Sequence, residues 1–132
     1  MNLTFVRDPK LNAEQVADLF RRSTIRRPVD DLERIGRMLA NANLTVCAFD
    51  GDKLVGIARS LTDFSYCCYL SDLAVDEAYQ KQGIGKELVS RTHDIIGPEC
   101  AFLLLAAPAA MDYYPHIGFQ KAENAWIIKR TE

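Results

Sequence analysis

The segment Gln80–Lys86 carries the residues with the clearest chemical potential in this chain. It reads Gln-Lys-Gln-Gly-Ile-Gly-Lys, and Gly83 and Gly85 leave the neighbouring backbone N–H groups unblocked by side chains. A helix beginning here would add the partial positive charge of its N-terminus. Free amides reached through glycines can hold a pyrophosphate group, because the backbone can approach it closely. The segment therefore predicts a phosphate-binding loop.

A strand and a helix are predicted to position this loop. Tyr69–Val75 has the composition of a mostly buried strand, and apolar residues recur at helical spacing over Ile84–Ile96. Two common phosphate loops are excluded. Glu87 stands where a Walker loop needs Ser or Thr, and Leu88 stands where a dinucleotide fingerprint needs a third glycine. An ordinary glycine-opened helix start without a ligand is the alternative interpretation.

Composition limits the class of protein. With 132 residues, 48% hydrophobic and 26% charged, the chain is expected to form one globular domain over residues 1–132. The net charge of −2 gives no electrostatic support for binding nucleic acid or an anionic membrane. No apolar run reaches the roughly 18 residues of a membrane span, and no signal-peptide pattern is visible, so we expect a cytoplasmic protein. The four cysteines lack metal-ligand spacing, which predicts no metal.

The remaining pattern predicts a strand, two helices, three antiparallel strands, a helix, a strand, a helix and two strands. The expected strands are Leu3–Val6, Leu44–Phe49, Lys53–Thr62, Cys67–Val75, Ala101–Ala106, Phe119–Ala122 and Ala125–Lys129. The expected helices are Ala13–Arg22, a segment capped by Asp30 and ending near Asn41, Gly83–Ile96 and Ala109–His116. Because Ala101–Ala106 shows no alternation, it is predicted to be buried on both faces, in a right-handed strand–helix–strand unit.

This order of elements, together with two motifs, resembles the GNAT family of N-acetyltransferases. One motif is Gln80-x-x-Gly83-x-Gly85 after a strand ending in Leu-Ala-Val, and the other is Met111–Phe119, with its aromatic-Tyr-x-x-x-Gly-Phe pattern. The resemblance covers essentially the whole chain. It implies an α/β (α+β) GNAT fold, with a mixed, mostly antiparallel sheet of about seven strands and four helices. A weaker similarity links the chain to plant serotonin (arylalkylamine-type) acetyltransferases.

The resemblance implies transfer of an acetyl group from acetyl-coenzyme A (acetyl-CoA) to a primary amine, by direct attack in a ternary complex. The pantetheine arm would pair with main-chain groups of Leu73, Ala74 and Val75, where a bulge turns one N–H toward the acetyl carbonyl. The pyrophosphate would lie on the loop residues Gln80, Lys81, Gln82, Gly83, Ile84, Gly85 and Lys86. Whether the two lysines add charge there or are only solvated stays open.

Two residues are candidates for proton transfer. The resemblance makes Tyr114 the general acid that protonates the leaving thiolate, and packing is its alternative role. Pro115 follows it directly and biases its backbone away from a helix. Asp72 is the candidate general base, acting directly or through water, and a structural hydrogen bond is the alternative.

The acceptor is expected to be a small-molecule amine or an amine of a protein or peptide. By the resemblance, Arg27 and Asp31 in the linker between the first two helices, and Trp126 near the C-terminus, would contact it. Asp31 could instead cap a helix, and Trp126 could pack on the sheet or in a homodimer contact. A competing class is a regulatory or interaction module that binds acetyl-CoA with little turnover, and the presence of Tyr114 favours the enzyme.

Overall fold

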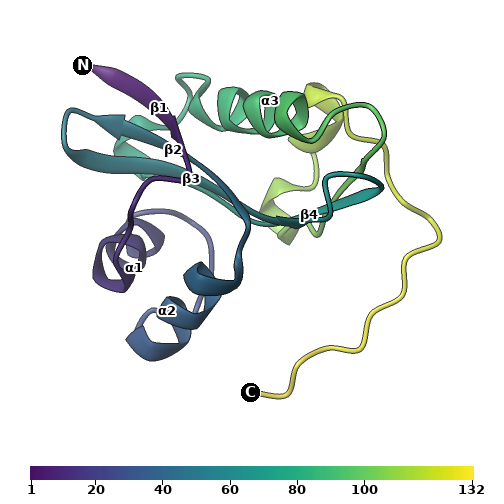
Figure 1. Ribbon diagram of the computed structural model, residues 1–132, viewed down its shortest axis with the longest axis horizontal. Helices are drawn as coiled ribbons and strands as arrows, with labels where there is room; N and C mark the ends of the chain where they lie inside the picture. Colours follow the sequence, from purple (N-terminus) through teal and green to yellow (C-terminus); the bar gives the residue numbers. More distant parts are fainter.

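Helices cover both faces of one five-stranded sheet in the computed structural model, which describes residues 1–132 (Figure 1). The strands, in spatial as in chain order, are β1 (Leu3–Arg7), β2 (Leu44–Asp50), β3 (Lys53–Thr62), β4 (Cys67–Val75) and β5 (Ala101–Leu104). The pairs from β1 to β4 are antiparallel, and β5 lies parallel to β4. The helices are α1 (Ala13–Arg21), α2 (Leu32–Asn41) and α3 (Ile84–Ile96).

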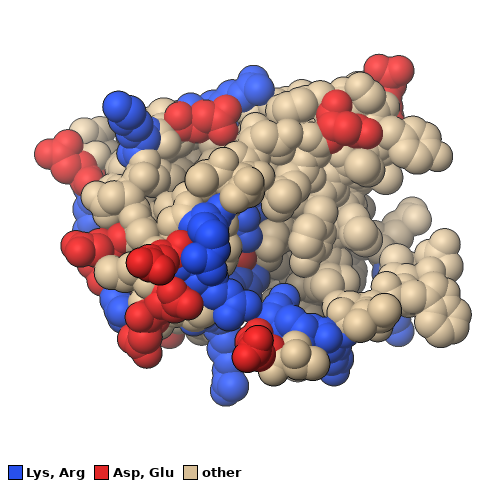
Figure 2. All heavy atoms as spheres, turned by 60° about the horizontal axis from the view of Figure 1, so that its bottom comes forward, with Lys and Arg blue, Asp and Glu red and all other residues tan.

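Two apolar clusters hold these layers together. One lies between α3 and the sheet and includes Leu88, Val89 and Leu70, and the other lies under α1 and α2 and includes Phe20 and Ile35. Gly56 of β3 allows α3 to approach, because a Cβ there would lie 3.0 Å from Leu88 Cδ1. On the α1–α2 side, charges of both signs are interspersed, whereas the part of that view beside the C-terminal segment is mostly uncharged (Figure 2).

A bulge in β4 decides which residues face which cluster. Arg59 of β3 is paired with Asp72 and the next residue, Ser60, with Leu70, so Ser71 is the extra residue on β4. Leu70, before the bulge, packs in the α3 cluster, whereas Ala74, beyond it, packs in the α1–α2 cluster. The bulge therefore reverses the alternation expected of a regular strand.

Both N-terminal helices begin at a side-chain cap. The Asn12 side chain accepts a hydrogen bond from Gln15 N at 2.8 Å. For α2 the cap is Asp31, which accepts from Arg34 N at 3.0 Å, and not Asp30 as expected. No helix has the length and apolar run required to cross a bilayer.

The prediction of seven strands and four helices is wrong for the last third of the chain. In place of the expected helix Ala109–His116 there are two 3₁₀ turns, Pro108–Ala110 and Tyr114–Ile117. Each has a proline in its first positions, where the missing N–H costs least, and Pro115 cannot continue a helix begun before it. β5 ends at Leu104 and is an edge strand rather than a strand buried on both faces.

The two predicted C-terminal strands, Phe119–Ala122 and Ala125–Lys129, do not form. From Gln120 onward every residue is exposed and none lies in a helix or strand. An isolated extended segment has no ladder of hydrogen bonds to hold it, because a strand is stable only beside a partner strand. In Figure 1 this segment leaves the body near α3 and runs outward before it returns toward α2.

Candidate functional site

The candidate site lies where β4 and β5 separate. β5 pairs with β4 only along Cys67–Leu70, and Ser71–Val75 continue without a strand on that flank. Main-chain groups on the open flank are available to a ligand, because a backbone N–H or C=O must find a partner in the protein, in water or in a bound molecule. A cleft of about 530 Å³ opens at this point.

The cleft gathers most of the residues that the sequence predicts to bind the cofactor. Its walls are the linker after α1, the end of β4, the loop that opens α3 and the turns after β5. The lining residues are Ser23, Thr24, Ile25, Leu73, Ala74, Val75, Tyr79, Gln80, Lys81, Gly83, Ile84, Gly85, Lys86, Ala110, Tyr113, Tyr114 and Ile117. Of the predicted cofactor residues only Gln82 is missing from the cleft lining. The predicted acid, Tyr114, lies in the same cleft.

The loop has the backbone shape of an anion cradle. Lys81 and Gly83 both adopt positive φ, 65° and 81°, and Gly83 begins α3 without any side-chain cap. The first-turn amides of α3 therefore have no side chain competing for them, at the positive end of the helix dipole. Gln80 Nε2 donates to Val75 O at 3.1 Å, which ties the loop to the end of β4.

Two tyrosines face this loop from the opposite wall. A Cβ at Gly85 would lie 3.2 Å from Tyr113 Oη, so the Tyr113 hydroxyl lies directly against the start of α3. The Tyr113 and Tyr114 rings meet edge-on at 5.3 Å, and Phe119 supports Tyr114 at 5.6 Å. Burial raises the pKa of both phenols, and for Tyr114 the neighbouring Tyr113 raises the pKa further. Both are therefore protonated donors at neutral pH.

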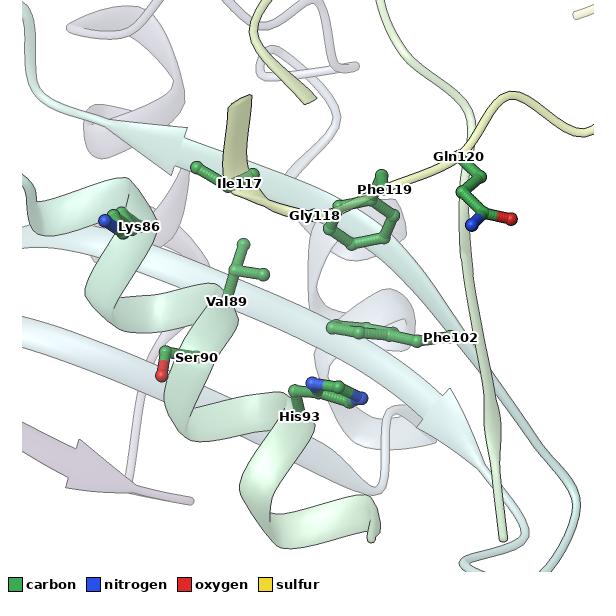
Figure 3. Close-up of a pocket in the computed structure, with 9 residues that line it drawn as sticks. All are labelled: Lys86, Val89, Ser90, His93, Phe102, Ile117, Gly118, Phe119 and Gln120. Carbon is green, nitrogen blue, oxygen red and sulfur yellow. The ribbon is translucent and has the colours of Figure 1, made fainter. Parts of the chain in front are cut away.

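A second hollow of about 480 Å³ lies on the other side of Lys86 and Ile117, which line both (Figure 3). His93 of α3 stacks on Phe102 of β5 at 5.7 Å, and Phe119 leans on the same ring at 5.3 Å. Lys86 and Ile117 form the wall between the two hollows. Apart from Lys86, the loop and the β4 flank line only the first hollow, which is therefore the candidate site.

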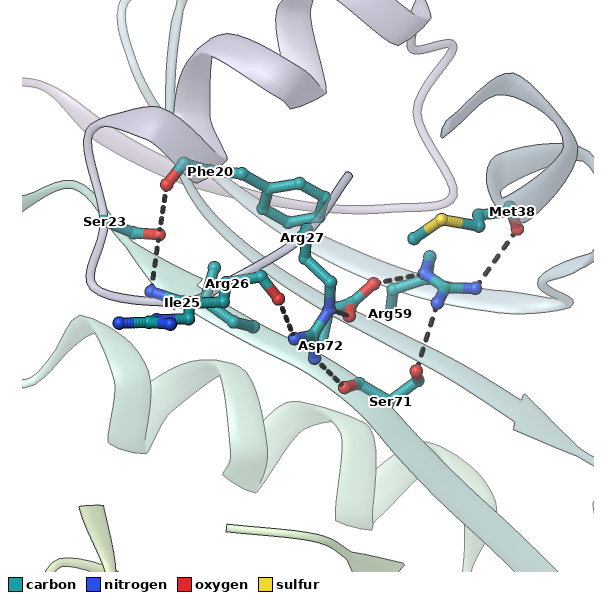
Figure 4. A network of polar contacts seen from close by, with 9 residues as sticks. All are labelled: Phe20, Ser23, Ile25, Arg26, Arg27, Met38, Arg59, Ser71 and Asp72. Carbon is teal, nitrogen blue, oxygen red and sulfur yellow. Dashed lines mark hydrogen bonds and ion pairs between the residues drawn. The ribbon is translucent and has the colours of Figure 1, made fainter. Parts of the chain in front are cut away.

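Asp72 is at the centre of a buried ionic network (Figure 4). Its side chain is fully buried, and its two carboxylate oxygens accept from Arg27 Nε and from Arg59 Nε, the latter at 2.5 Å. Arg27 also donates to Ser71 O at 2.7 Å, and Arg59 donates to Met38 O at 3.1 Å. The network thus joins the α1–α2 linker and α2 to β3 and β4.

This placement corrects the predicted role of Asp72. The bulge turns the carboxylate away from the cleft, and both oxygens are already engaged by guanidinium groups, so no face is open to an amine. The Arg27 side chain is engaged in the ion pair with Asp72, and the Asp31 side chain caps α2. Trp126, in the extended segment, is 96% exposed. None of these four residues lines the cleft.

The linker was expected to contact the acceptor through Arg27 and Asp31, but its beginning, Ser23–Ile25, lines the cleft instead. The 3₁₀ turn (Glu77–Tyr79), which also reaches the cleft, was not expected as part of the site. Arg22 links the two: its carbonyl accepts from Glu77 N at 2.8 Å, and its Nη1 donates to buried Asp76 at 2.5 Å. Tyr79 lines the cleft, but its hydroxyl is committed to Asp50 Oδ2 at 2.5 Å. Only the proximity of these segments in space identifies them, because their sequences carry no motif.

We predict that Asp72→Asn lowers the free energy of unfolding by about 3–5 kcal/mol, because it leaves two buried guanidinium groups without their countercharge. Urea unfolding measures the change. The matched control is Asp18→Asn, which removes an exposed pair with Arg21 and should cost about 0–1 kcal/mol. Equal effects for the two variants would contradict the structural role assigned to Asp72.

Comparison with known proteins relates this chain to acetyltransferases. The family model described as an acetyltransferase (GNAT) domain matches residues 9–127. GCN5-related N-acetyltransferase 2, chloroplastic, of Arabidopsis thaliana is 33% identical over 70 residues, which cover 52% of this chain and 27% of that protein. Across the curated relatives reached, the matches cover 27–54% of the relative's length.

Solved structures show the same fold. A probable acetyltransferase from meticillin-resistant Staphylococcus aureus superposes with a TM-score of 0.79 at 23% identity, covering 97% of this chain and 99% of that one. An aminoglycoside N-acetyltransferase in complex with CoA gives a TM-score of 0.70 at 15% identity, covering 98% and 95%. With the family model matching most of its length, the chain belongs to the GNAT family of acetyltransferases.

Proposed function

We propose that this protein moves an acetyl group from acetyl-CoA to a primary amine, by direct attack while both molecules are bound. The observation that carries the proposal is the convergence, in one cleft, of the uncapped start of α3, the open flank of β4 and the side chain of Tyr114. These are an anion site, a line of main-chain partners and a proton donor. Acetyl transfer from a thioester attached to a pyrophosphate needs all three.

The walls of the cleft match the parts of acetyl-CoA. The pyrophosphate would accept hydrogen bonds from the amides at the start of α3, with Lys81 and Lys86 close by. The pantetheine amides would pair with main-chain groups of Leu73–Val75, on the flank that β5 leaves open. The Tyr113 hydroxyl, lying against Gly85, would donate to the cofactor near the loop. The CoA complex of a fold neighbour supports this choice of co-substrate.

The proposed reaction is a single displacement. The amine nitrogen forms a bond to the acetyl carbonyl carbon, the carbon–sulfur bond breaks, and the departing sulfur takes the proton of Tyr114 Oη. Backbone N–H groups on the β4 flank would stabilise the oxyanion that forms on the way. The nitrogen releases its surplus proton to water, and water reprotonates Tyr114.

The charges that line the cleft limit the protonation state in which an amine acceptor can enter. No aspartate, glutamate or histidine lines it, and its two charged side chains, Lys81 and Lys86, are both cationic. An ammonium ion finds no countercharge there, so the acceptor is proposed to enter as the neutral amine. Weakly basic amines, such as the α-amine of a peptide with a pKa near 7.7–8.0, are then favoured over alkylamines with a pKa near 10.4. A neutral amine group of an aminoglycoside-like molecule would fit the same condition.

We predict that acetyl-CoA stabilises the fold by about 2.7 kcal/mol at a hundredfold excess over its dissociation constant. Gly83→Asp should abolish this stabilisation, because it adds a negative charge where the pyrophosphate would lie. Gly51→Asp is the matched control, since Gly51 also has positive φ and open space around it but lies in the β2–β3 hairpin. Thermal unfolding with and without acetyl-CoA makes the comparison, and a wild type indifferent to acetyl-CoA would contradict the proposal.

Replacing Tyr114 by Phe should lower the turnover number by about 10² or more while the affinity for acetyl-CoA stays nearly unchanged. Because the acid must be protonated and burial raises its pKa above the usual value near 10, the wild type should keep this advantage through pH 9. The control is Tyr113→Phe, expected to weaken cofactor binding rather than turnover. Thiol release from acetyl-CoA measures both, and normal cofactor binding with no acceptor-dependent release by the wild type would indicate a binding module.

For an acceptor that enters as the neutral amine, kcat/KM should rise about tenfold per pH unit until the acceptor's own pKa is reached. At pH 7 a peptide α-amine should therefore exceed an alkylamine of similar size by roughly a few hundredfold. Asp31→Asn should leave KM unchanged, since Asp31 lies outside the cleft. Values of kcat/KM that do not change with pH below the acceptor pKa would show that a protein group takes the proton.

A further inference from the structure

The linker that forms one wall of the cleft is fastened to β4 and its continuation at two points. At one point Arg22 donates from Nη1 to the buried carboxylate of Asp76, directly after β4, at 2.5 Å. At the other, Arg27 donates from Nη2 to the main-chain carbonyl of Ser71, in the bulge of β4, at 2.7 Å. The cleft-lining residues between these two contacts are Ser23–Ile25 and Leu73–Val75. The two arginines therefore mark the ends of the part of the cleft that the linker and β4 line together.

Arg27 closes its end of the cleft with three contacts. Its Nε donates to the Asp72 carboxylate, its Nη2 to Ser71 O, and its Nη1 to Arg26 O in the linker itself (Figure 4). Displacing the guanidinium would separate the fully buried Asp72 carboxylate from one of its two countercharges, which is costly. Beyond this point β5 already pairs with β4, up to Leu70, so the open flank of β4 does not continue.

The proposed position of acetyl-CoA directs its acyl group toward this closed end. The pyrophosphate would lie at the start of α3, close to Val75, because a Cβ at Gly85 would lie 3.7 Å from Val75 Cγ2. A pantetheine arm that pairs with Leu73–Val75 then runs along β4 toward Ser71, about 13 Å from Val75 at about 3.3 Å per residue of strand. Carbon atoms added to the acyl group in this direction extend toward the Arg27 guanidinium.

We infer that Arg27 is a specificity-determining residue for the acyl donor, and that it selects acetyl-CoA over longer acyl-CoA molecules by closing the cleft at Ser71. A longer acyl chain reaches Arg27 and has to displace its guanidinium from Asp72. The burial of a few methylene groups does not offset the loss of that buried ion pair. The inference rests on the proposed function for the position of the donor in the cleft, and it does not require turnover.

Removing the Arg27 side chain would open an apolar space for a longer chain. Ile25 and Val29, which stand two residues before and after Arg27, both pack against the α1–α2 cluster. The Asp72 carboxylate would keep one countercharge, because Arg59 Nε donates to its other oxygen. Alkyl carbons could then be buried where the guanidinium lay, and each buried methylene group would strengthen binding by about three- to fourfold.

The test compares the dissociation constants of acetyl-CoA and butyryl-CoA, which differ by two methylene groups, by titration calorimetry. The wild type should bind acetyl-CoA more tightly, by about tenfold or more, since butyryl-CoA has to break the buried pair. Arg27→Ala should reverse the order and bind butyryl-CoA about tenfold more tightly than acetyl-CoA. Arg27→Lys keeps a countercharge for Asp72 but has a single ammonium in place of the forked guanidinium. It should shift the ratio in the same direction, and it decides the test if Arg27→Ala fails to fold.

Arg22→Ala is the matched control, because it releases the same linker at the opposite end of the cleft. It should weaken the binding of both acyl-CoA molecules alike and leave their ratio unchanged, as a purely structural effect of Arg27 would also do. An unchanged ratio in every folded Arg27 variant would overturn the inference, and so would a wild type that binds butyryl-CoA as tightly as acetyl-CoA. Binding of acetyl-CoA without acceptor-dependent thiol release would contradict the proposed transfer, while the ratio still supports or overturns the role of Arg27.

Discussion

The burial of the Asp72 carboxylate between two guanidinium groups is the interaction on which the site depends most directly. A buried charge must keep its countercharges, because separating it from them is far more costly than breaking an exposed pair. Here the countercharges come from two different parts of the chain, Arg59 in β3 and Arg27 in the linker. The linker is therefore fixed to the sheet, and with it Ser23–Ile25, which form one wall of the cleft.

The bulge at Ser71 makes this arrangement compatible with an apolar core. In a regular strand Asp72 would face the same side as Leu70, which packs under α3. The extra residue turns Asp72 toward the linker and leaves Leu73 and Val75 to line the cleft. It occurs just where β5 stops following β4, so one irregularity serves the ionic network and the open flank together.

Local signals in the sequence predicted the loop, β4 and α3, because glycine spacing and apolar periodicity describe segments that fold largely by their own pattern. For Asp72 the sequence left two roles open, a general base and a structural hydrogen bond, since a bulge changes which face a residue takes and residue types do not indicate a bulge. The two C-terminal strands were expected because Ala125–Lys129 has β propensity. A strand also needs an edge, however, and propensity says nothing about which edge is available. The sequence did not indicate Tyr113 as a site residue, because only the fold reveals that its hydroxyl reaches Gly85.

Arg22 connects two walls of the cleft, the linker that begins at Ser23 and the turn that leads into the loop. Its carbonyl and guanidinium hold Glu77 and Asp76 at the beginning of the turn that leads into the loop, while its own backbone leads directly into Ser23. If a ligand orders the loop, these contacts would also restrain Ser23–Ile25, which line the same cleft. Linkage requires such an effect to be reciprocal, so whatever factor acetyl-CoA adds to acceptor affinity, the acceptor returns to acetyl-CoA. The coupling free energy is measured by titrating either ligand with and without the other and comparing the two dissociation constants.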